Sequence, residues 1–367
     1  MTKRTPLYET HVKYNGKIVD FAGWELPIQY QGIKEEHLAV RENAGMFDIS
    51  HMGEVFVEGK DAEKFADYLV TNDVTVLVDT QVLYSPMCNK EGGIVDDLLV
   101  YRYNEEKYLF VINAGNIDKD FKWMNDQVDG FEVTLRNESD AYGDIALQGP
   151  KAQEILQQLT EFSLKDIKFF YFADEVMIGK YSCIVSRTGY TGEDGFEIYV
   201  KAEDTAGLFE LIYEAGKEYG LELAALGARD TLRFEAGLPL YGNELSDTIS
   251  PLEASLAFFV KLDKNDFIGK DVLVKQKTDG LTRKSIGFEL IGKGIARHGY
   301  EVCSEDGKVI GEVTTGYQLP GTKRSIGVAL VDIEHKALDT QIFVKLRNKL
   351  VEAKVTKKTF YKKKYKK

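Results

Sequence analysis

Short β-prone runs alternate irregularly with amphipathic helical segments over the first 270 residues of this 367-residue chain. A regular β-α-β repeat would predict a parallel sheet, whereas this irregular order favours an α+β fold with antiparallel sheets. Residues 81–87, 94–103 and 108–113 are three such runs, and the turn-like segment 89–93 joins the first two. These runs predict a β-meander.

A second α+β unit follows the meander. Gly149 and Pro150 separate a β-prone run at 144–148 from a helical segment that begins at Lys151. Because the chain is longer than a single hydrophobic core usually supports, several structural units are expected. Further strands are predicted at 180–188 and 195–200, and further helices at 205–219 and 226–237.

Near residue 270 the predicted elements change from a mixture of helices and strands to short β-prone pieces separated by turns. We therefore expect residues 1–270 to form two interleaved α+β subdomains and residues 271–367 to form a small all-β domain that resembles a barrel or jelly roll. The β-prone pieces of this last region alternate with turns and lie at 284–290, 308–314, 326–331 and 341–345.

Composition argues against several classes of protein. The formal net charge of −12 disfavours a protein that binds nucleic acid by neutralising phosphates. The three cysteines are odd in number and far apart, and the five histidines show no ligand spacing, so neither a disulfide framework nor a metal site is expected. No stretch approaches the roughly 18 apolar residues of a membrane span, and the N-terminus shows no leader pattern. We expect a cytoplasmic protein with no membrane partner.

Two adjacent carboxylates, Asp96 and Asp97, interrupt the apolar run at 94–103. Because side chains alternate along a strand, Asp97 shares a face with Tyr101, whereas Asp96 lies on the other face. Together with Tyr84 from the preceding run, the Asp97 face offers an aromatic wall and a fixed polar group, which suit a flat heterocycle. The alternative is a half-exposed strand with both carboxylates at its solvated end, and periodicity alone does not separate the two.

Two further segments contain candidate binding groups. The glycine-rich run 187–197 includes Tyr190 and Glu197 but matches no phosphate-binding fingerprint, and it also fits an ordinary hairpin loop. Arg229 and Arg233 lie one helical turn apart. They could direct two guanidinium groups at one anion, or they could form a salt-bridged helix surface with neighbouring acids.

Two other features, the C-terminal tail and Cys183, are interpreted as structural and not as functional. The lysine-rich tail from Lys354 to Lys367 is typical of a frayed, solvated end, with docking of an acidic partner as the alternative. Cys183 has no neighbouring base in its β-prone run, so a buried structural thiol is expected and covalent nucleophilic catalysis is not.

Several short motifs occur together in a specific order, although each one alone is weak. On these motifs the chain resembles the aminomethyltransferase (T-protein) family of the glycine cleavage system, from about residue 3 to residue 361. The motifs are DFAGWELP at 20–27, GMFDISHMGE at 45–54, TNDV at 71–74, GGIVDDLLVY at 92–101, QGPK at 148–151, and the segments 187–197, 226–235 and 297–301.

The resemblance implies three domains around a central cavity for tetrahydrofolate. It also implies transfer of a methylene group to tetrahydrofolate from the aminomethyl-lipoyl arm of the H-protein, with release of ammonia. By motif matching, Asp97 is the essential aspartate, which would stabilise developing positive charge and handle protons. Glu197 would accept paired hydrogen bonds from the pterin edge, and Arg229 would donate to the same ligand. The folate-binding set implied by the resemblance is Tyr84, Asp97, Tyr101, Tyr190, Glu197 and Arg229.

The chain departs from the family pattern at Phe258, where relatives often have tryptophan, and at Phe169, where some have tyrosine. Two other functions remain open. One is a folate-binding maturation or regulatory module without this turnover, although such relatives carry a cysteine motif on a helix that here reads LGARD at 226–230. The other is a binding protein for a different flat anionic ligand.

Overall fold

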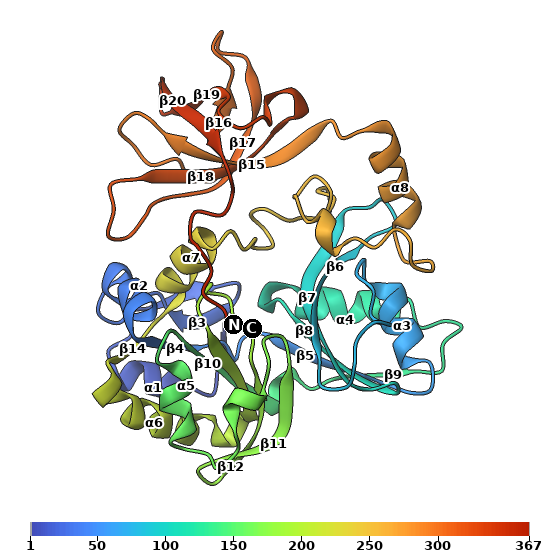
Figure 1. The fold of residues 1–367 in the computed structure, drawn as a ribbon, viewed down its shortest axis with the longest axis vertical. Helices are drawn as coiled ribbons and strands as arrows, with labels where there is room; N and C mark the ends of the chain where they lie inside the picture. Colours follow the sequence, from blue (N-terminus) through green and yellow to red (C-terminus); the bar gives the residue numbers. More distant parts are fainter. Residues whose placement is uncertain (1, 367) are drawn as a thin grey trace.

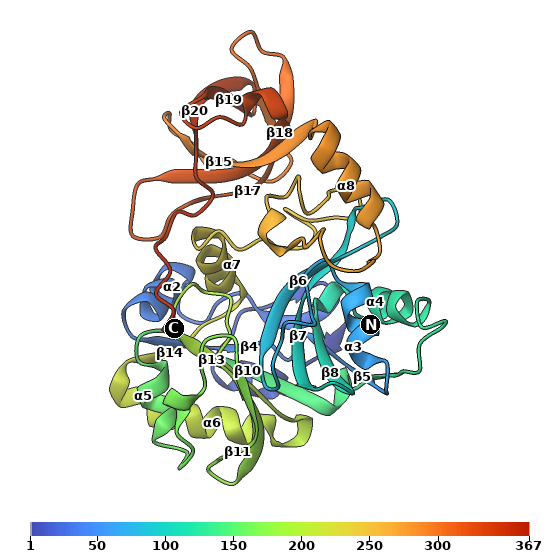
Figure 2. The same ribbon diagram turned by 45° about the vertical axis from the view of Figure 1, so that its right-hand side comes forward.

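The computed structural model describes residues 2–366, and the molecule has three lobes (Figure 1). Two lobes built on β-sheets lie side by side, and a closed β-barrel lies above them in this view. The same separation is visible after the molecule is turned (Figure 2). The expectation of an α+β fold with three domains and a C-terminal barrel is confirmed.

The first lobe is a five-stranded antiparallel sheet in the order β6-β7-β8-β5-β9. Its apolar face packs against helices α3 (Ala62–Leu69) and α4 (Ile117–Asn125). The strands are β5 (Gly53–Glu58), β6 (Val82–Cys88), β7 (Ile94–Asn104), β8 (Lys107–Ile112) and β9 (Thr134–Asn137). The predicted meander is therefore confirmed as β6, β7 and β8.

The second lobe is a six-stranded sheet in the order β11-β12-β13-β10-β4-β14. Only the pairing of β14 with β4 is parallel among these strands. One face packs against α5 (Ala152–Gln157) and α6 (Thr205–Gly216), and the other against α2 (Ile33–Glu42) and α7 (Leu226–Glu235). The strands are β4 (Ala44–Asp48), β10 (Tyr142–Gln148), β11 (Phe172–Ile178), β12 (Tyr181–Ser186), β13 (Gly195–Lys201) and β14 (Leu221–Leu223).

The two lobes exchange chain segments. Strand β4 belongs to the second lobe and ends at Asp48, whereas β5 belongs to the first lobe and begins at Gly53. The N-terminal segment likewise contributes Leu7 to the core of the second lobe and Trp24 to the core of the first. This segment forms a small sheet of β1 (Lys3–Arg4), β2 (Ile18–Phe21) and β3 (Trp24–Pro27), with helix α1 (Tyr8–Lys13).

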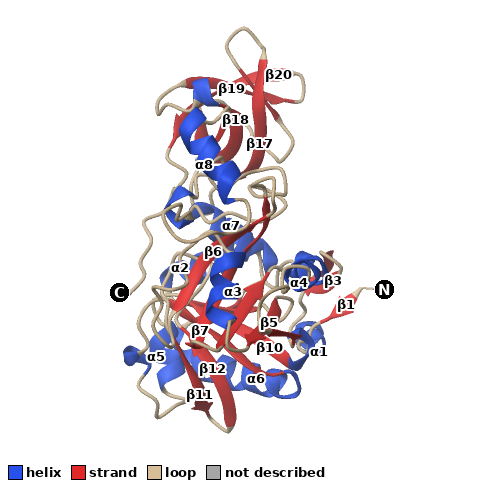
Figure 3. Ribbon diagram, turned by 90° about the vertical axis from the view of Figure 1, so that its right-hand side faces the viewer, coloured by secondary structure: helices blue, strands red, loops and turns tan. Residues whose placement is uncertain are grey.

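The C-terminal lobe is a closed six-stranded barrel in the order β15-β18-β17-β16-β19-β20. Helix α8 (Lys270–Asp279) precedes it and lies between the barrel and the first lobe (Figure 3). The sequence predicts four of these strands and misses the short β16 and the lysine-rich β20. The strands are β15 (Arg283–Leu290), β16 (Glu301–Cys303), β17 (Val309–Gln318), β18 (Ser325–Asp332), β19 (Gln341–Leu346) and β20 (Lys349–Thr356). Within residues 2–366, no helix has the length and apolar character needed to cross a membrane.

The expectation of a frayed C-terminal end is wrong. Lys354 lies in β20, and the described residues after this strand return to the second lobe (Figure 1). The backbone N–H of Phe360 donates to the carbonyl of Glu235 at 3.0 Å, and the Arg41 guanidinium lies 3.8 Å from the ring centre of Tyr361. Aromatic residues within the tail thus anchor it, because they find apolar and cationic partners on the second lobe.

Candidate active site

A central cavity of about 690 Å³ lies where the lobes meet. Most of its wall is apolar or aromatic, and a few charged side chains interrupt that wall, which is the usual composition of a small-molecule site. The aromatic and polar residues of the lining include Phe21, His51, Tyr84, Asp97, Asn113, Asp144, Phe169, Tyr190, Glu197, Tyr199, Arg229, Phe259, Lys363 and Tyr365.

Asp97 faces this cavity from strand β7. The Tyr84 hydroxyl donates to Oδ2 of Asp97 at 2.9 Å, and the side-chain amide of Asn113 donates to Oδ1 at 3.0 Å. Burial, together with the charge of Asp96, raises the pKa of Asp97 to about 7. The alternative of two carboxylates at a solvated strand end is wrong, because Asp96 is fully buried on the other face of the strand.

Glu197 faces the cavity from strand β13 of the second lobe. The Thr188 hydroxyl donates to Oε2 of Glu197 at 2.5 Å. Burial raises the pKa of Glu197, while Thr188 and the charge of Arg229 oppose that shift. Asp97 and Glu197 therefore face the cavity from different lobes, and both carboxyl groups are removed from bulk water.

Tyr101 lies behind the cavity wall rather than in it. Its ring is fully buried, it is absent from the lining, and its hydroxyl lies 3.0 Å from the hydroxyl of Tyr199, which does line the cavity. The predicted folate contact of Tyr101 stays a prediction, and in this structure the residue reaches the cavity through Tyr199.

The two arginines on helix α7 have different environments. Arg233 is buried and pairs with Asp230 at 2.8 Å and with Glu244 at 2.6 Å. The side chain of Arg229 has no ion pair or hydrogen bond within residues 2–366, and its guanidinium lies 4.9 Å from the ring centre of Tyr190. Only Arg229 is therefore available to a ligand, and Arg233 takes the salt-bridged role of the alternative interpretation.

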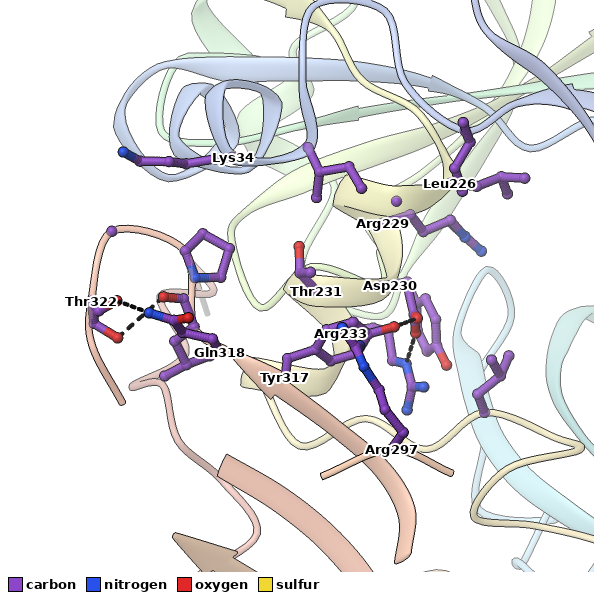
Figure 4. A pocket seen from close by; sticks show the side chains of 18 of the residues that line it. Lys34, Leu226, Arg229, Asp230, Thr231, Arg233, Arg297, Tyr317, Gln318 and Thr322 are labelled. Carbon is purple, nitrogen blue, oxygen red and sulfur yellow. Dashed lines mark hydrogen bonds and ion pairs between the residues drawn. The ribbon is translucent and has the colours of Figure 1, made fainter. Parts of the chain in front are cut away.

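An outer cavity of about 870 Å³ adjoins the central one (Figure 4). The two cavities share Phe21, Tyr190, Arg229 and Leu240 as lining residues. Helix α7 forms one wall of the outer cavity, and the barrel forms the other through Arg297, Tyr317 and the loop 318–323. Arg229 thus lies at the boundary between an inner and an outer compartment.

Sequence reasoning missed several lining residues. Tyr365 stacks on Phe169 with ring centres 4.3 Å apart and planes 23° apart, and Lys363 lies beside it in the lining. The aromatic residues spaced through the lysine-rich tail were the available signal for this contact. Of the two departures from the family pattern, Phe169 lines the cavity, whereas Phe258 is 77% exposed and its neighbour Phe259 takes the lining position.

Two buried polar residues of the cavity also escaped prediction. Burial lowers the pKa of His51 to about 4, so its ring is neutral at physiological pH. Both carboxyl oxygens of Asp144 lack a hydrogen-bond partner within residues 2–366, and burial raises the pKa of Asp144 well above its usual range. Asp144 lies in β10 and His51 in the turn between β4 and β5, and nothing in their local sequence distinguishes them from other polar residues in such elements.

Comparison with known proteins adds family evidence to this geometry. Residues 7–264 match the family described as the GCVT N-terminal domain, and residues 283–362 match the glycine cleavage T-protein C-terminal barrel domain. The predicted boundary after residue 270 lies between the two matched regions.

Individual relatives agree with the family match. The aminomethyltransferase of Caldanaerobacter subterraneus subsp. tengcongensis is 59% identical, over 100% of this chain and 97% of that relative. The aminomethyltransferase of Thermoanaerobacter pseudethanolicus is 58% identical, over 100% and 99%. The crystal structure of glycine cleavage system aminomethyltransferase T from Bartonella henselae superposes with a TM-score of 0.93 at 32% identity, and both chains are fully covered.

Two α+β lobes and a barrel around a shared cavity, matched by both family descriptions, define the class of protein. The chain belongs to the glycine cleavage T-protein family. Its activity is that of an aminomethyltransferase, because its relatives share this activity at high identity over their full length.

Proposed function

We propose that this aminomethyltransferase uses tetrahydrofolate and the lipoylated H-protein as its two substrates. The sulfur-bound aminomethyl group of the lipoyl arm would lose ammonia, and its methylene would pass to tetrahydrofolate, giving 5,10-methylenetetrahydrofolate and a free thiol on the arm. The observation that supports this proposal best is the pair of carboxyl groups, Asp97 and Glu197, that face one aromatic-walled cavity from different lobes.

The cavity wall matches the needs of a reduced pterin. Glu197 offers two acceptor oxygens, which suit the paired N–H donors on the amino-pyrimidine edge of a pterin. Arg229, with its free guanidinium at the boundary of the cavity, would donate to the same ring system. Tyr190 and the stacked pair of Phe169 and Tyr365 supply flat apolar surface for the rest of the ligand.

Asp97 would donate a proton to the departing nitrogen and then stabilise the positive charge on the methylene carbon. With a pKa of about 7, it holds a proton part of the time at neutral pH and can release it to the departing nitrogen. The resulting carboxylate would then stabilise the positive charge that develops on the methylene carbon, an effect strengthened by the exclusion of water. Tyr84 and Asn113 fix the carboxylate in place through their hydrogen bonds.

The outer cavity is a suitable entrance for the lipoyl arm. It opens beside the central cavity, and its rim includes the cations Lys34, Arg297 and Lys323. The one acid in its lining, Asp230, is engaged by Arg233 and by the Tyr317 hydroxyl (Figure 4). This cationic rim would attract an acidic partner surface. The C-terminal tail stays an alternative docking element, because its aromatic residues pack on the second lobe while Lys362, Lys364 and Lys366 are exposed.

The test is a reconstituted turnover assay that compares Asp97→Asn with wild type. The variant should keep tetrahydrofolate binding and lose most ammonia release from aminomethylated H-protein, because it lacks the ionisable group. Asp118→Asn, an exposed site on α4, is the matched control and should behave as wild type. Equal turnover by Asp97→Asn and wild type would exclude Asp97 from the reaction. Binding without turnover in the wild-type protein would instead support a maturation or regulatory module.

A further inference from the structure

A second buried carboxyl group lies directly behind Asp97. Asp96 is fully buried on the opposite face of β7 and does not line the central cavity. The Asn113 backbone N–H donates to Oδ2 of Asp96 at 3.0 Å, while the side-chain amides of Asn113 and Asn116 each donate to Oδ1 at 2.8 Å. Three N–H donors and an otherwise enclosed site form the environment of an ionised carboxylate.

The Asn113 side chain connects this group to Asp97. Its amide nitrogen donates to Asp96 Oδ1 at 2.8 Å and to Asp97 Oδ1 at 3.0 Å. Because both oxygens accept from one nitrogen, they lie less than about 6 Å apart. At that separation, inside a protein, the charge on one carboxylate strongly disfavours ionisation of the other.

We propose that Asp96 is a positioning residue for the transfer reaction, whose fixed negative charge, held by Asn113 and Asn116, keeps Asp97 able to exchange a proton at neutral pH. This inference rests on the proposed function of Asp97. Without the charge on Asp96, Asp97 would be a stronger acid and mostly ionised at neutral pH, so it would seldom hold a proton for the departing nitrogen.

The other carboxyl group behind β7 is neutral, so Asp96 is the negative charge that acts on Asp97 from this side of the strand. Behind Asp96, Asp120 on α4 is fully buried, and neither of its oxygens makes a well-aligned hydrogen bond within residues 2–366. Burial, with the charge of Asp96 as a second cause, raises the pKa of Asp120 to about 10, so it is neutral at physiological pH. Lys119, whose Nζ lies 3.0 Å from Asp120, only partly opposes this shift.

On the cavity side, the other carboxyl groups in the lining are Glu197 and Asp144, both on the second lobe, and burial raises the pKa of each. Burial raises the pKa of Tyr84 and of Tyr190, so both phenols are neutral. Arg229 contributes a positive charge at the cavity boundary, and Glu197 lies on the second lobe. Neither residue is among the groups that set the ionisation of Asp97, whereas Asp96 is the first cause after burial.

The direct test is a titration of the ligand-free, full-length protein labelled with ¹³C at the aspartate carboxyl carbon. In wild type, the Asp97 signal, assigned by its loss in Asp97→Asn, should titrate near pH 7. Asp96→Asn should lower that midpoint by about one to two pH units, since a like charge is removed. Asp120→Asn is the matched control: it removes an equally buried carboxyl that is already neutral, so the midpoint should not move.

A midpoint that stays in place in Asp96→Asn, or that falls equally in Asp120→Asn, would overturn the proposal. If Asp96→Asn does not fold, the Asp96 signal of the wild-type protein decides instead. At neutral pH that signal should lie at the chemical shift of a carboxylate, because three N–H groups donate to its oxygens, and a protonated Asp96 would refute the idea. None of these measurements uses turnover. If the wild-type protein were inactive in the turnover assay, the proposed function would fail, and the titration would still test the role of Asp96 separately.

Discussion

Replacing Asp97 with asparagine should make the ligand-free protein more stable, and increasingly so as the pH rises. The pKa of Asp97 is raised from 3.8 to about 7 in the folded protein. Between these two values the folded state binds more protons than the unfolded state, so wild-type stability falls as the pH increases. Above pH 7 the loss is complete and stays constant.

The size of the change in unfolding free energy follows from the pKa shift of Asp97. From pH 5 to pH 8 the wild-type protein loses about 1.4 kcal/mol per pH unit well below the pKa and less near it, or about 3 kcal/mol altogether. Asparagine does not titrate. The difference in unfolding free energy between Asp97→Asn and wild type should therefore grow by about 3 kcal/mol over this range, whatever constant offset the lost hydrogen bonds add.

Equilibrium urea unfolding of both proteins at pH 5 and at pH 8 measures this difference. The same comparison for Asp118→Asn, on the exposed face of α4, should show little change with pH. A difference between Asp97→Asn and wild type that is the same at both pH values would show that Asp97 is ionised in the folded protein at pH 5. The proton-handling role would then fail.

Three further predictions concern the cavity and the thiols. Glu197→Gln should weaken tetrahydrofolate binding about tenfold to hundredfold in calorimetry, because an amide cannot accept two hydrogen bonds from the pterin edge, and unchanged affinity would exclude that contact. Tyr365→Ala should raise the KM for tetrahydrofolate about threefold to tenfold with little change in kcat, since it removes stacking surface at Phe169, and a selective loss of kcat would contradict this assignment. The buried thiols Cys88, Cys183 and Cys303 should react with an aromatic disulfide reagent only on unfolding, and rapid labelling of the native protein would count against the fold.

The local sequence pattern predicted the part of the site that lies on a single strand. The alternation along β7 correctly separates Asp97, which faces the cavity, from Asp96, which faces the interior. The meander and most of the barrel strands were also predictable, because their β-prone runs are bounded by turns. The family resemblance supplied the cavity itself, since no single element shows it.

Long-range contacts were not predictable in the same way. Arg229 and Arg233 lie one helical turn apart, and Arg233 is neutralised by Asp230 on the same helix together with Glu244, which the fold brings near. Tyr365 reaches the cavity because the chain leaves the barrel and packs against the second lobe. A lysine-rich composition suggested a solvated end, and the apolar partners that anchor the tail lie far away in the sequence.

Asp97 and Glu197 should contact one tetrahydrofolate molecule inside the central cavity. A crystal structure of the protein with bound tetrahydrofolate shows whether they do. The pterin edge should lie on the Glu197 carboxylate, with the Asp97 carboxyl group directed at the same ligand. A ligand bound outside the cavity, or an Asp97 side chain that turns away from it, would contradict the proposed mechanism.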